Sequence, residues 1–249
     1  MNYRTEKLDG HTWLIEEYND HNSVYMYLLE GEERAVLIDT GIGRIPLRTI
    51  CSGLTDLPVS VLLTHGHADH IGGTGVFDDV RIAREDEELY RMHSADEIRR
   101  IFADGEPYPV KEAERLKFFK DGERFDLGGR TVEVIASPGH SVGSVCFLDR
   151  ERRQMFTGDT CCRAHVLLQM EFAAPVDVFR SSVRRLLDLG GLYDITWPGH
   201  HAKPVGKDVL EEFLAASDGL VKGTMEGRTV KLPMGTCRLL EYGEIGIEY

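Results

Sequence analysis

The sequence predicts a layered α/β domain whose functional site lies along one edge, and three observations support this fold class. Strand-like and helix-like segments alternate twice along the chain. In each half, apolar segments that resemble strands end directly in polar motifs, which is where binding and catalytic residues usually lie. The 249 residues are also enough to bury a sizeable core. We expect one domain over residues 1–249.

The first strands are predicted within residues 11–39. Three runs combine β-branched, aromatic and apolar residues, with Gly31 as a turn between the last two; these runs are "HTWLIEEY", "SVYMYLLE" and "RAVLIDTG". The segment "RIPLRTICSGL" favours a helix because its apolar residues recur near helical spacing. The short run "VSVLLTH", residues 59–65, is typical of a buried strand.

The middle and the end of the chain continue this alternation. Residues 85–121 are charged and periodic, and they predict a helical insert of two or three helices broken by "GEPYP". Strand signals return in "TVEVIASPGH", "SVCFLD", "QMFTGDT" and "DITWPGH". Helices are expected over about 176–189 and 207–221, and strand-like pieces close the chain.

Charge and cysteine content limit the classes of partner. The chain has 42 acidic and 29 basic residues, a formal net charge of −13, and no basic stripe. A surface of this sign repels phosphate backbones, so we expect no nucleic-acid partner. Five scattered cysteines are not a disulfide framework and favour a reduced, cytoplasmic protein. The polar start "MNYRTEKLDG" predicts no signal peptide, and the absence of a long apolar run predicts no membrane partner.

The stretch "THGHADHIGG", residues 64–73, packs four residues of metal-ligand type into six positions. In H-x-H, alternate residues of an extended backbone lie on the same side, so His65 and His67 can converge on one point. Asp69 and His70 follow at the expected start of a helix, where they can address a second point. The two glycines after them allow this helix to pack closely against a neighbour. Imidazole and carboxylate groups together suit zinc, iron or manganese.

Three later motifs place further ligand types at strand ends. His140 follows a Pro-Gly turn in "SPGHSVGS", Asp159 lies in "FTGDT", and His200 follows a second Pro-Gly turn in "WPGHH". The ordered set H-x-H-x-D-H, GH, GD and PGH resembles the metallo-β-lactamase-fold hydrolases over roughly residues 11–201. The resemblance implies a four-layer αββα sandwich with the metal site at one edge of its two sheets.

The same resemblance implies a site for two divalent transition-metal ions, with zinc preferred over iron or manganese. The first ion would be held by His65, His67 and His140, the second by Asp69, His70 and His200, and Asp159 would bridge them. A hydroxide between the ions would be the nucleophile. Asp69 would act in catalysis by orienting it or by moving a proton to the leaving group. Asp39, in "LIDTG", would orient a ligand histidine.

Departures from the family's pattern narrow the reaction. β-Lactamases of this fold carry cysteine or serine where Asp159 stands, and quorum-quenching lactonases carry tyrosine where Cys162 stands. Flavin-dependent di-iron members have a glutamate in the first motif, and RNA-processing members have large added domains. What remains resembles the hydroxyacylglutathione hydrolase-like branch, which implies hydrolysis of a small ester- or thioester-like substrate. The alternatives are a lactonase or phosphodiesterase, a mononuclear-iron enzyme that oxidises persulfides, and a non-catalytic metal-binding protein.

Residues beside these motifs are candidates for substrate binding. Arg163 and His165 follow the bridging aspartate and could line the pocket. His21 could overhang the pocket from the loop "YNDHNS". These three residues have no motif of their own, so the prediction depends on their position in the chain.

Two further features have a packing interpretation beside a functional one. Cys161 and Cys162 could be soft ligands or a nucleophile, but we favour small residues that fill a packed strand end. Aromatic residues of the insert could form a pocket wall, although aromatic residues at helical spacing more often pack helices onto a domain. We expect the insert to cap the metal edge and to set the size of the substrate.

Overall fold

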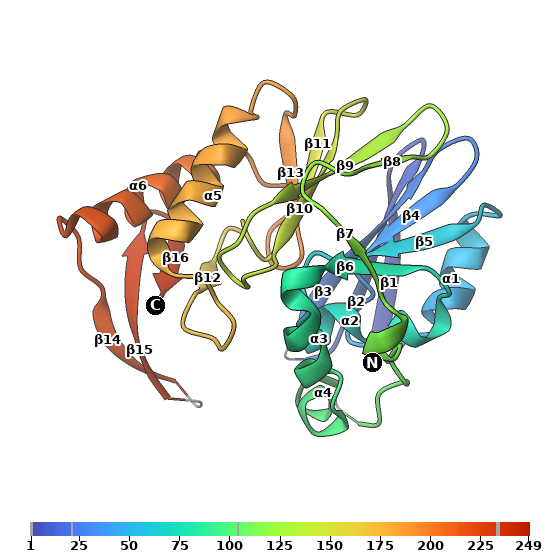
Figure 1. Ribbon diagram of the computed structural model, residues 1–249, viewed down its shortest axis with the longest axis horizontal. Helices are drawn as coiled ribbons and strands as arrows, with labels where there is room; N and C mark the ends of the chain where they lie inside the picture. The colour runs from blue at the N-terminus through green and yellow to red at the C-terminus, as the bar shows by residue number, and fades with distance from the viewer. Residues whose placement is uncertain (1, 21, 104, 233–234) are drawn as a thin grey trace. The chain divides into compact units, whose positions relative to one another are not determined.

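The computed structural model describes residues 2–20, 22–103, 105–232 and 235–249. Within these ranges the chain forms several sheets and six α-helices (Figure 1), in agreement with the predicted α/β class. The chain divides into two compact units, Met1–Val134 and Ile135–Tyr249. No helix in the described part of the chain is long and apolar enough to cross a membrane.

The first unit contains a seven-stranded sheet whose strands follow one another in chain order. The strands are β1 (Asn2–Asp9), β2 (Thr12–Tyr18), β3 (Ser23–Glu30), β4 (Ala35–Ile38), β5 (Val59–Leu62), β6 (Val80–Ala83) and β7 (Lys117–Phe119). The strands β1 to β4 pair antiparallel, and β4 to β7 pair parallel. Because β4 and β5 are parallel neighbours, the residues that follow them, among them Asp39 and Thr64, emerge at the same edge of the sheet.

Four α-helices are described in this unit. Helix α1 (Leu47–Leu54) confirms the predicted helix and buries Leu47, Ile50 and Cys51 in the core. The other three are α2 (Ala68–Ile71), α3 (Glu87–His93) and α4 (Asp96–Ala103). Both α3 and α4 contact α2, and Figure 1 shows the three helices gathered at one end of the unit. Short 3₁₀ turns cover Thr74–Val76, Arg84–Asp86 and Ala113–Arg115.

Three strands of the seven-stranded sheet were not predicted, namely β1, β6 and β7. Strand β1 is exposed along most of its length, so its sequence lacks the alternating apolar pattern of a half-buried strand. Strand β7 lies within the predicted helical insert over about 85–121, which has α-helix only up to Ala103. Three residues are too few to show a period, so the sequence did not distinguish β7 from the helices before it.

A five-stranded sheet has the order β13-β11-β10-β9-β8. Its strands are β8 (Arg124–Asp126), β9 (Thr131–Ala136), β10 (Val145–Asp149), β11 (Gln154–Gly158) and β13 (Ile195–Pro198). Strand β11 pairs antiparallel with β10 and parallel with β13. Asp159 directly follows β11, and His200 follows β13 after one residue. The parallel pairing therefore brings these two residues out at the same edge.

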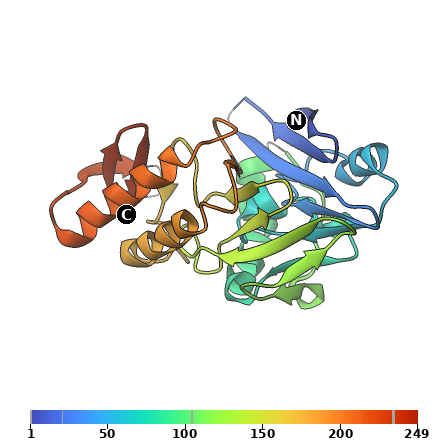
Figure 2. The same ribbon diagram turned by 90° about the horizontal axis from the view of Figure 1, so that it is seen from above.

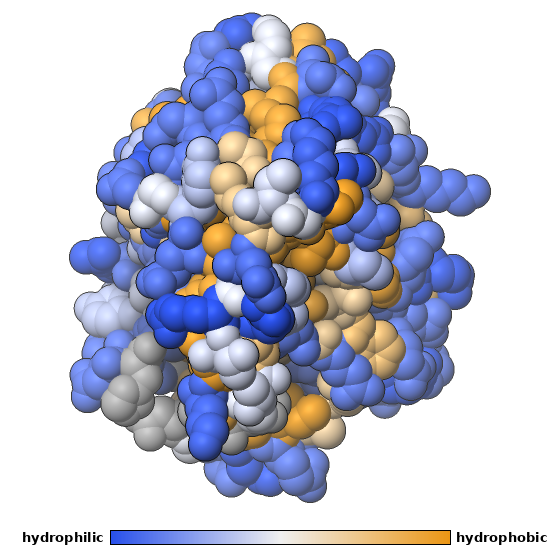
Figure 3. All heavy atoms as spheres, turned by 90° about the vertical axis from the view of Figure 1, so that its left-hand side faces the viewer, coloured by the Kyte–Doolittle hydropathy of each residue, from blue (hydrophilic) through white to orange (hydrophobic). Residues whose placement is uncertain are grey.

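The second unit contains two helices and a four-stranded sheet of order β12-β16-β15-β14. Helices α5 (Val176–Asp188) and α6 (Asp208–Lys222) lie side by side (Figures 1 and 2) and confirm both predicted helices. Phe179 and Phe213 join them edge to face, with ring centroids 5.6 Å apart. The strands are β12 (His165–Leu167), β14 (Arg228–Leu232), β15 (Gly235–Tyr242) and β16 (Ile245–Glu248). In Figure 3, which faces α6 and these last strands, hydrophilic residues cover most of the surface and hydrophobic ones emerge between them.

Candidate metal centre

The ligand loop, residues 64–74, begins two residues after β5 and contains α2. Its four candidate ligands are buried: His65, His67, Asp69 and His70. The rings of His65 and His67 are perpendicular, with centroids 4.7 Å apart, and the rings of His65 and His70 are 4.2 Å apart. The expected convergence of the alternate histidines is confirmed, and α2 adds His70 to the same cluster.

Asp39, directly after β4, organises this loop. Its φ of 61° is a left-handed backbone conformation that residues other than glycine seldom adopt. One carboxylate oxygen accepts the backbone N–H of Thr64 at 2.7 Å, and the other accepts the Thr64 hydroxyl at 2.7 Å and Nδ1 of His70 at 2.9 Å. The expectation that Asp39 orients a histidine of the motif is confirmed.

These contacts fix which nitrogen of each imidazole can bind a metal. A carboxylate only accepts hydrogen bonds, so Nδ1 of His70 must be the donor to Asp39. The Thr64 hydroxyl has one proton and gives it to Asp39, so it accepts from Nδ1 of His65 at 3.0 Å. His65 and His70 therefore present Nε2 as the candidate ligand atom, the arrangement that outer hydrogen bonds usually impose on metal-binding histidines.

Close backbone contact holds α2 against the segment that follows Asp39. The N–H of Gly72 donates to the carbonyl of Gly41 at 2.8 Å. A Cβ on Gly72 would lie 2.1 Å from the carbonyl carbon of Ile42, and a Cβ on Gly73 would lie 2.8 Å from the carbonyl oxygen of Thr40. The expectation that these two glycines allow close packing of the helix is confirmed.

Asp69 has a neighbour that the sequence did not reveal. The amide of Asn22 donates to Oδ2 of Asp69 at 3.4 Å. Asn22 lies in the loop "YNDHNS" next to the predicted substrate residue His21, which lies outside the described residues. Position in this loop was the available sequence signal for Asn22, and the prediction from that signal named His21.

The second unit brings three more candidate ligands together. Nε2 of His140 and Nε2 of His200 each lie 3.5 Å from Oδ2 of Asp159. Nδ1 of His140 lies 3.1 Å from the carbonyl oxygen of Leu167 and must donate to it, so Nε2 of His140 is the nitrogen turned toward the carboxylate. Three residues far apart in the sequence thus meet as the motifs predicted.

The donor set fits a metal ion. Imidazole nitrogen and carboxylate oxygen are ligands of zinc and of the neighbouring transition metals. Two such atoms bound at about 2.0–2.1 Å in a tetrahedral site are about 3.4 Å apart, and the spacing in the second cluster is 3.5 Å. The chain therefore has histidine and aspartate groups suitable for holding metal ions.

The two described candidates for substrate binding make contacts on the second unit. The Arg163 guanidinium forms ion pairs with Glu244 and, at 2.8 Å, with Asp208. Nδ1 of His165 lies 2.9 Å from the carboxylate of Glu248. These partners are 45 to 83 residues away in the chain, so the sequence alone did not reveal them.

The Cys161–Cys162 pair packs inside the second unit. Cys161 belongs to the core cluster around α5 and α6, and Cys162 is also buried. Burial raises the pKa of the Cys162 thiol to about 12 and that of Cys161 well above its usual range. The packing interpretation is confirmed, and both side chains are thiols near neutral pH.

The family and sequence comparisons agree with these motifs. A family model described as "Metallo-beta-lactamase superfamily" matches residues 19–200. The human protein named "Acyl-coenzyme A thioesterase MBLAC2" is 29% identical over 219 residues, which cover 77% of this chain and 78% of the human protein. A protein of Aspergillus fumigatus named "Atrochrysone carboxyl ACP thioesterase" is 32% identical over 184 residues, 71% of this chain and 50% of the fungal protein.

Solved structures share the fold at lower sequence identity. A metallo-beta-lactamase from Pontibacter korlensis has a TM-score of 0.66 and 19% identity, over 87% of this chain and 99% of its own. A metallo-beta-lactamase family protein from Thermus thermophilus has a TM-score of 0.64 and 23% identity, over 87% of this chain and 82% of its own. These matches confirm the predicted fold class.

Proposed function

Because the chain belongs to the metallo-beta-lactamase superfamily, whose model matches residues 19–200, we propose that it is a dinuclear metal-dependent hydrolase of an acyl thioester. Superfamily membership confirms the predicted resemblance and the class of metal-dependent hydrolase. The narrower hydroxyacylglutathione hydrolase-like branch is not confirmed, since relatives named thioesterases match this chain. The names of those relatives favour a thioester over the other ester-like substrates that the sequence left open.

One observation carries the proposal: in the second unit, a single carboxylate oxygen of Asp159 lies 3.5 Å from Nε2 of both His140 and His200. A carboxylate placed equally between two imidazoles suits a ligand shared by two ions. We assign His65, His67 and His140 to one ion, Asp69, His70 and His200 to the other, and Asp159 to both. Zinc is the ion we expect, with iron or manganese as the alternatives.

The protein groups then have distinct tasks in the reaction. When bound, the ions would activate water and polarise the acyl carbonyl. Water oxygen adds to the acyl carbon, the carbon–sulfur bond breaks, and the products are a carboxylic acid and a thiol. Asp69, buried and contacted by the Asn22 amide, takes the proton from water and passes it toward the sulfur. Asp39 keeps His70 in the tautomer that presents Nε2.

A panel of substrates tests the reaction class. Acyl-coenzyme A thioesters of increasing chain length, an activated ester, a lactone and a phosphodiester are offered to the zinc-loaded protein, and thiol or acid release is followed. We expect thioester cleavage to give the highest kcat/KM and Asp159→Asn to abolish it, while the exposed control Asp188→Asn keeps wild-type rates. Preference for the lactone or the phosphodiester would support those alternatives and contradict the proposal.

The metal itself separates the remaining alternatives. A mononuclear-iron enzyme that oxidises persulfides would hold one iron per chain and consume oxygen, and a non-catalytic binding protein would show no turnover on any member of the panel. We expect neither result.

The small-molecule substrate and the five free cysteines also fit the expected cytoplasmic location, which a localisation experiment on the tagged full chain would test.

A further inference from the structure

Residues 86–99 form hydrogen bonds to the ligand loop from one side. We call this stretch of chain the support segment. The carboxylate of Asp86 accepts the backbone N–H of Gly66 at 2.9 Å. Nδ1 of His93 accepts the backbone N–H of Ala68 at 3.1 Å. Both acceptor side chains are buried. The two N–H groups therefore have side-chain acceptors where the loop departs from the sheet.

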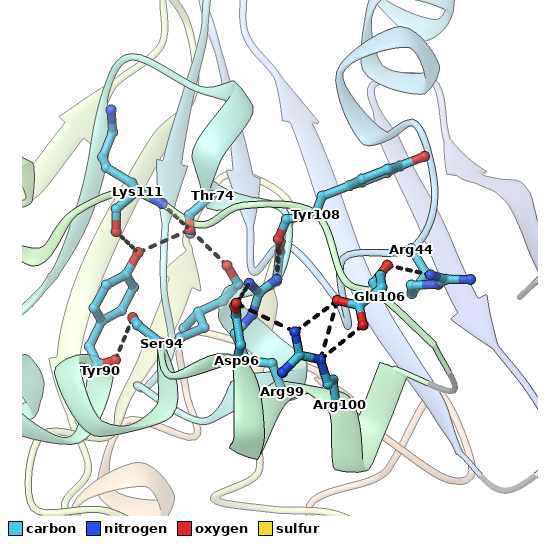
Figure 4. Close-up of polar contacts among 12 residues, drawn as sticks. Arg44, Thr74, Tyr90, Ser94, Asp96, Arg99, Arg100, Glu106, Tyr108 and Lys111 are labelled. Carbon is cyan, nitrogen blue, oxygen red and sulfur yellow. Dashed lines mark hydrogen bonds and ion pairs between the residues drawn. The ribbon is translucent and has the colours of Figure 1, made fainter.

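The support segment also holds the end of the loop. The hydroxyl of Tyr90 lies 3.0 Å from the hydroxyl of Thr74 and donates to the carbonyl of Lys111 at 2.8 Å. The buried guanidinium of Arg99 donates to the carbonyl of Gly72 at 3.4 Å and also to the carbonyl of Tyr108. Figure 4 shows Tyr90 and Arg99 reaching from the helices to these groups.

The bonded positions interleave with the candidate ligands. Gly66 lies between His65 and His67, and Ala68 lies between His67 and Asp69. Hydrogen bonds at Gly66 and Ala68 therefore hold the backbone from which the side chains of His65, His67 and Asp69 project. The fit is tight, because a Cβ on Gly66 would lie 2.8 Å from the backbone nitrogen of Tyr90.

His93 has a second connection to the cluster. Its ring lies 4.8 Å from the ring of His67, centroid to centroid. Because Nδ1 of His93 accepts from Ala68, the proton of the neutral ring is on Nε2. His93 received no function from the sequence, and here it acts as an acceptor for the loop backbone while it packs beside a candidate ligand.

From these contacts we propose that Asp86 and His93 are positioning residues of the metal centre, which set the backbone that carries His65, His67 and Asp69. This inference rests on the proposed function, since it assumes that these side chains bind metal. It changes the expected role of the insert. The main role of this part of the insert is to hold the ligand loop in place by hydrogen bonds. A role in setting the size of the substrate would be secondary.

Zinc affinity of the full chain, measured by competition with a chromophoric chelator, tests the proposal. We expect Asp86→Ala and His93→Leu to bind zinc about 10–100-fold more weakly than wild type, the usual effect of removing an outer hydrogen-bond partner. Asp86→Asn and His93→Asn keep an oxygen that can accept the N–H, so their affinity should stay near that of wild type. The exposed controls Asp78→Ala and His11→Leu should not change it.

A second readout needs no metal. In the metal-free protein, amide hydrogen exchange at Gly66 and Ala68 should be slow in wild type, faster in Asp86→Ala and His93→Leu, and slow again in the asparagine variants. Should His93→Leu fail to fold, the pair His93→Asn and His93→Gln gives the same comparison, because glutamine carries its acceptor further from the backbone.

The outcomes separate the two claims. Wild-type zinc affinity in Asp86→Ala and His93→Leu, with faster exchange at Gly66 and Ala68, would overturn the positioning role and leave the proposed function in place. Equal losses in the alanine, leucine and asparagine variants would also overturn it, since the acceptor would then be irrelevant. A wild-type chain that binds no metal would overturn the proposed function and this inference with it.

Discussion

Asp39 and His70 form a buried pair in which the carboxylate accepts Nδ1 of the imidazole at 2.9 Å. The same carboxylate also holds the backbone N–H and the hydroxyl of Thr64. One residue of the strand end after β4 thereby fixes both the ring of His70 and the start of the ligand loop. The pair is therefore a direct way to perturb the proposed metal centre without removing a ligand.

We predict that Asp39→Asn lowers metal affinity about 10–100-fold. The asparagine keeps one oxygen to accept hydrogen bonds from the three groups that donate to Asp39. Its NH₂ group is itself a donor and cannot accept any of these hydrogen bonds. Chelator competition measures the loss, and the exposed Asp56→Asn is the matched control. An Asp39→Asn protein that binds metal as tightly as wild type would show that the carboxylate does not orient His70 for coordination.

The glycine that directly follows α2 supplies a prediction on stability. Gly72→Ala should be strongly destabilised, because its Cβ would lie 2.1 Å from the backbone of Ile42 and neither backbone can move away cheaply. Gly53→Ala, in α1 with nothing within 4 Å of the added carbon, should instead gain about 0.5–1 kcal/mol. Urea unfolding compares the two, and similar midpoints in both variants would contradict the packing described for Gly72.

The buried cysteines should be dispensable for catalysis. We predict that the double variant Cys161→Ala, Cys162→Ala keeps most of the thioesterase activity, because both thiols are buried and their pKa values are raised by burial. Oxygen from labelled water should enter the acid product in the first turnover. An acyl group trapped on either cysteine and detected by mass spectrometry would contradict solvent attack.

Asp79 gives a prediction on pH. Partial burial alone would raise the pKa of this carboxyl, but hydrogen bonds from Lys117, Ser60 and Arg81 outweigh it and lower the pKa. A lowered folded pKa stabilises the fold above the unfolded pKa of about 3.9, and this stabilisation is lost as pH falls through the folded value. The urea midpoint of metal-free wild type should exceed that of Asp79→Asn at pH 6, and the gap should close on acidification. A gap that widens toward low pH would refute this sign.

The sequence predicted the parts of the fold and the site that have a local signal. H-x-H requires only an extended backbone, so the meeting of His65 and His67 could be read directly from their spacing. His140, Asp159 and His200 follow apolar strands and Pro-Gly or Gly-Asp turns, which also have a local pattern. Helices α5 and α6 were predicted because their apolar residues recur with the period of a helix.

The parts that were not predicted depend on contacts without such a pattern. Asp86 and His93 each accept a hydrogen bond from a backbone group, 20 and 25 residues away respectively, and no periodicity marks an acceptor of that kind. Asn22 reaches Asp69 across 47 residues. The exposed strand β1 and the short strand β7 lack the apolar alternation that identifies a strand.

The number of metal ions per chain tests the central claim most directly. Elemental analysis of protein purified without chelator should give close to two transition-metal ions per chain. His140→Ala should lose mainly the ion assigned to His65 and His67, and His70→Ala mainly the ion assigned to Asp69 and His200, so each variant should retain close to one. One ion or fewer in wild type, even after reconstitution with zinc, iron or manganese, would contradict the dinuclear centre.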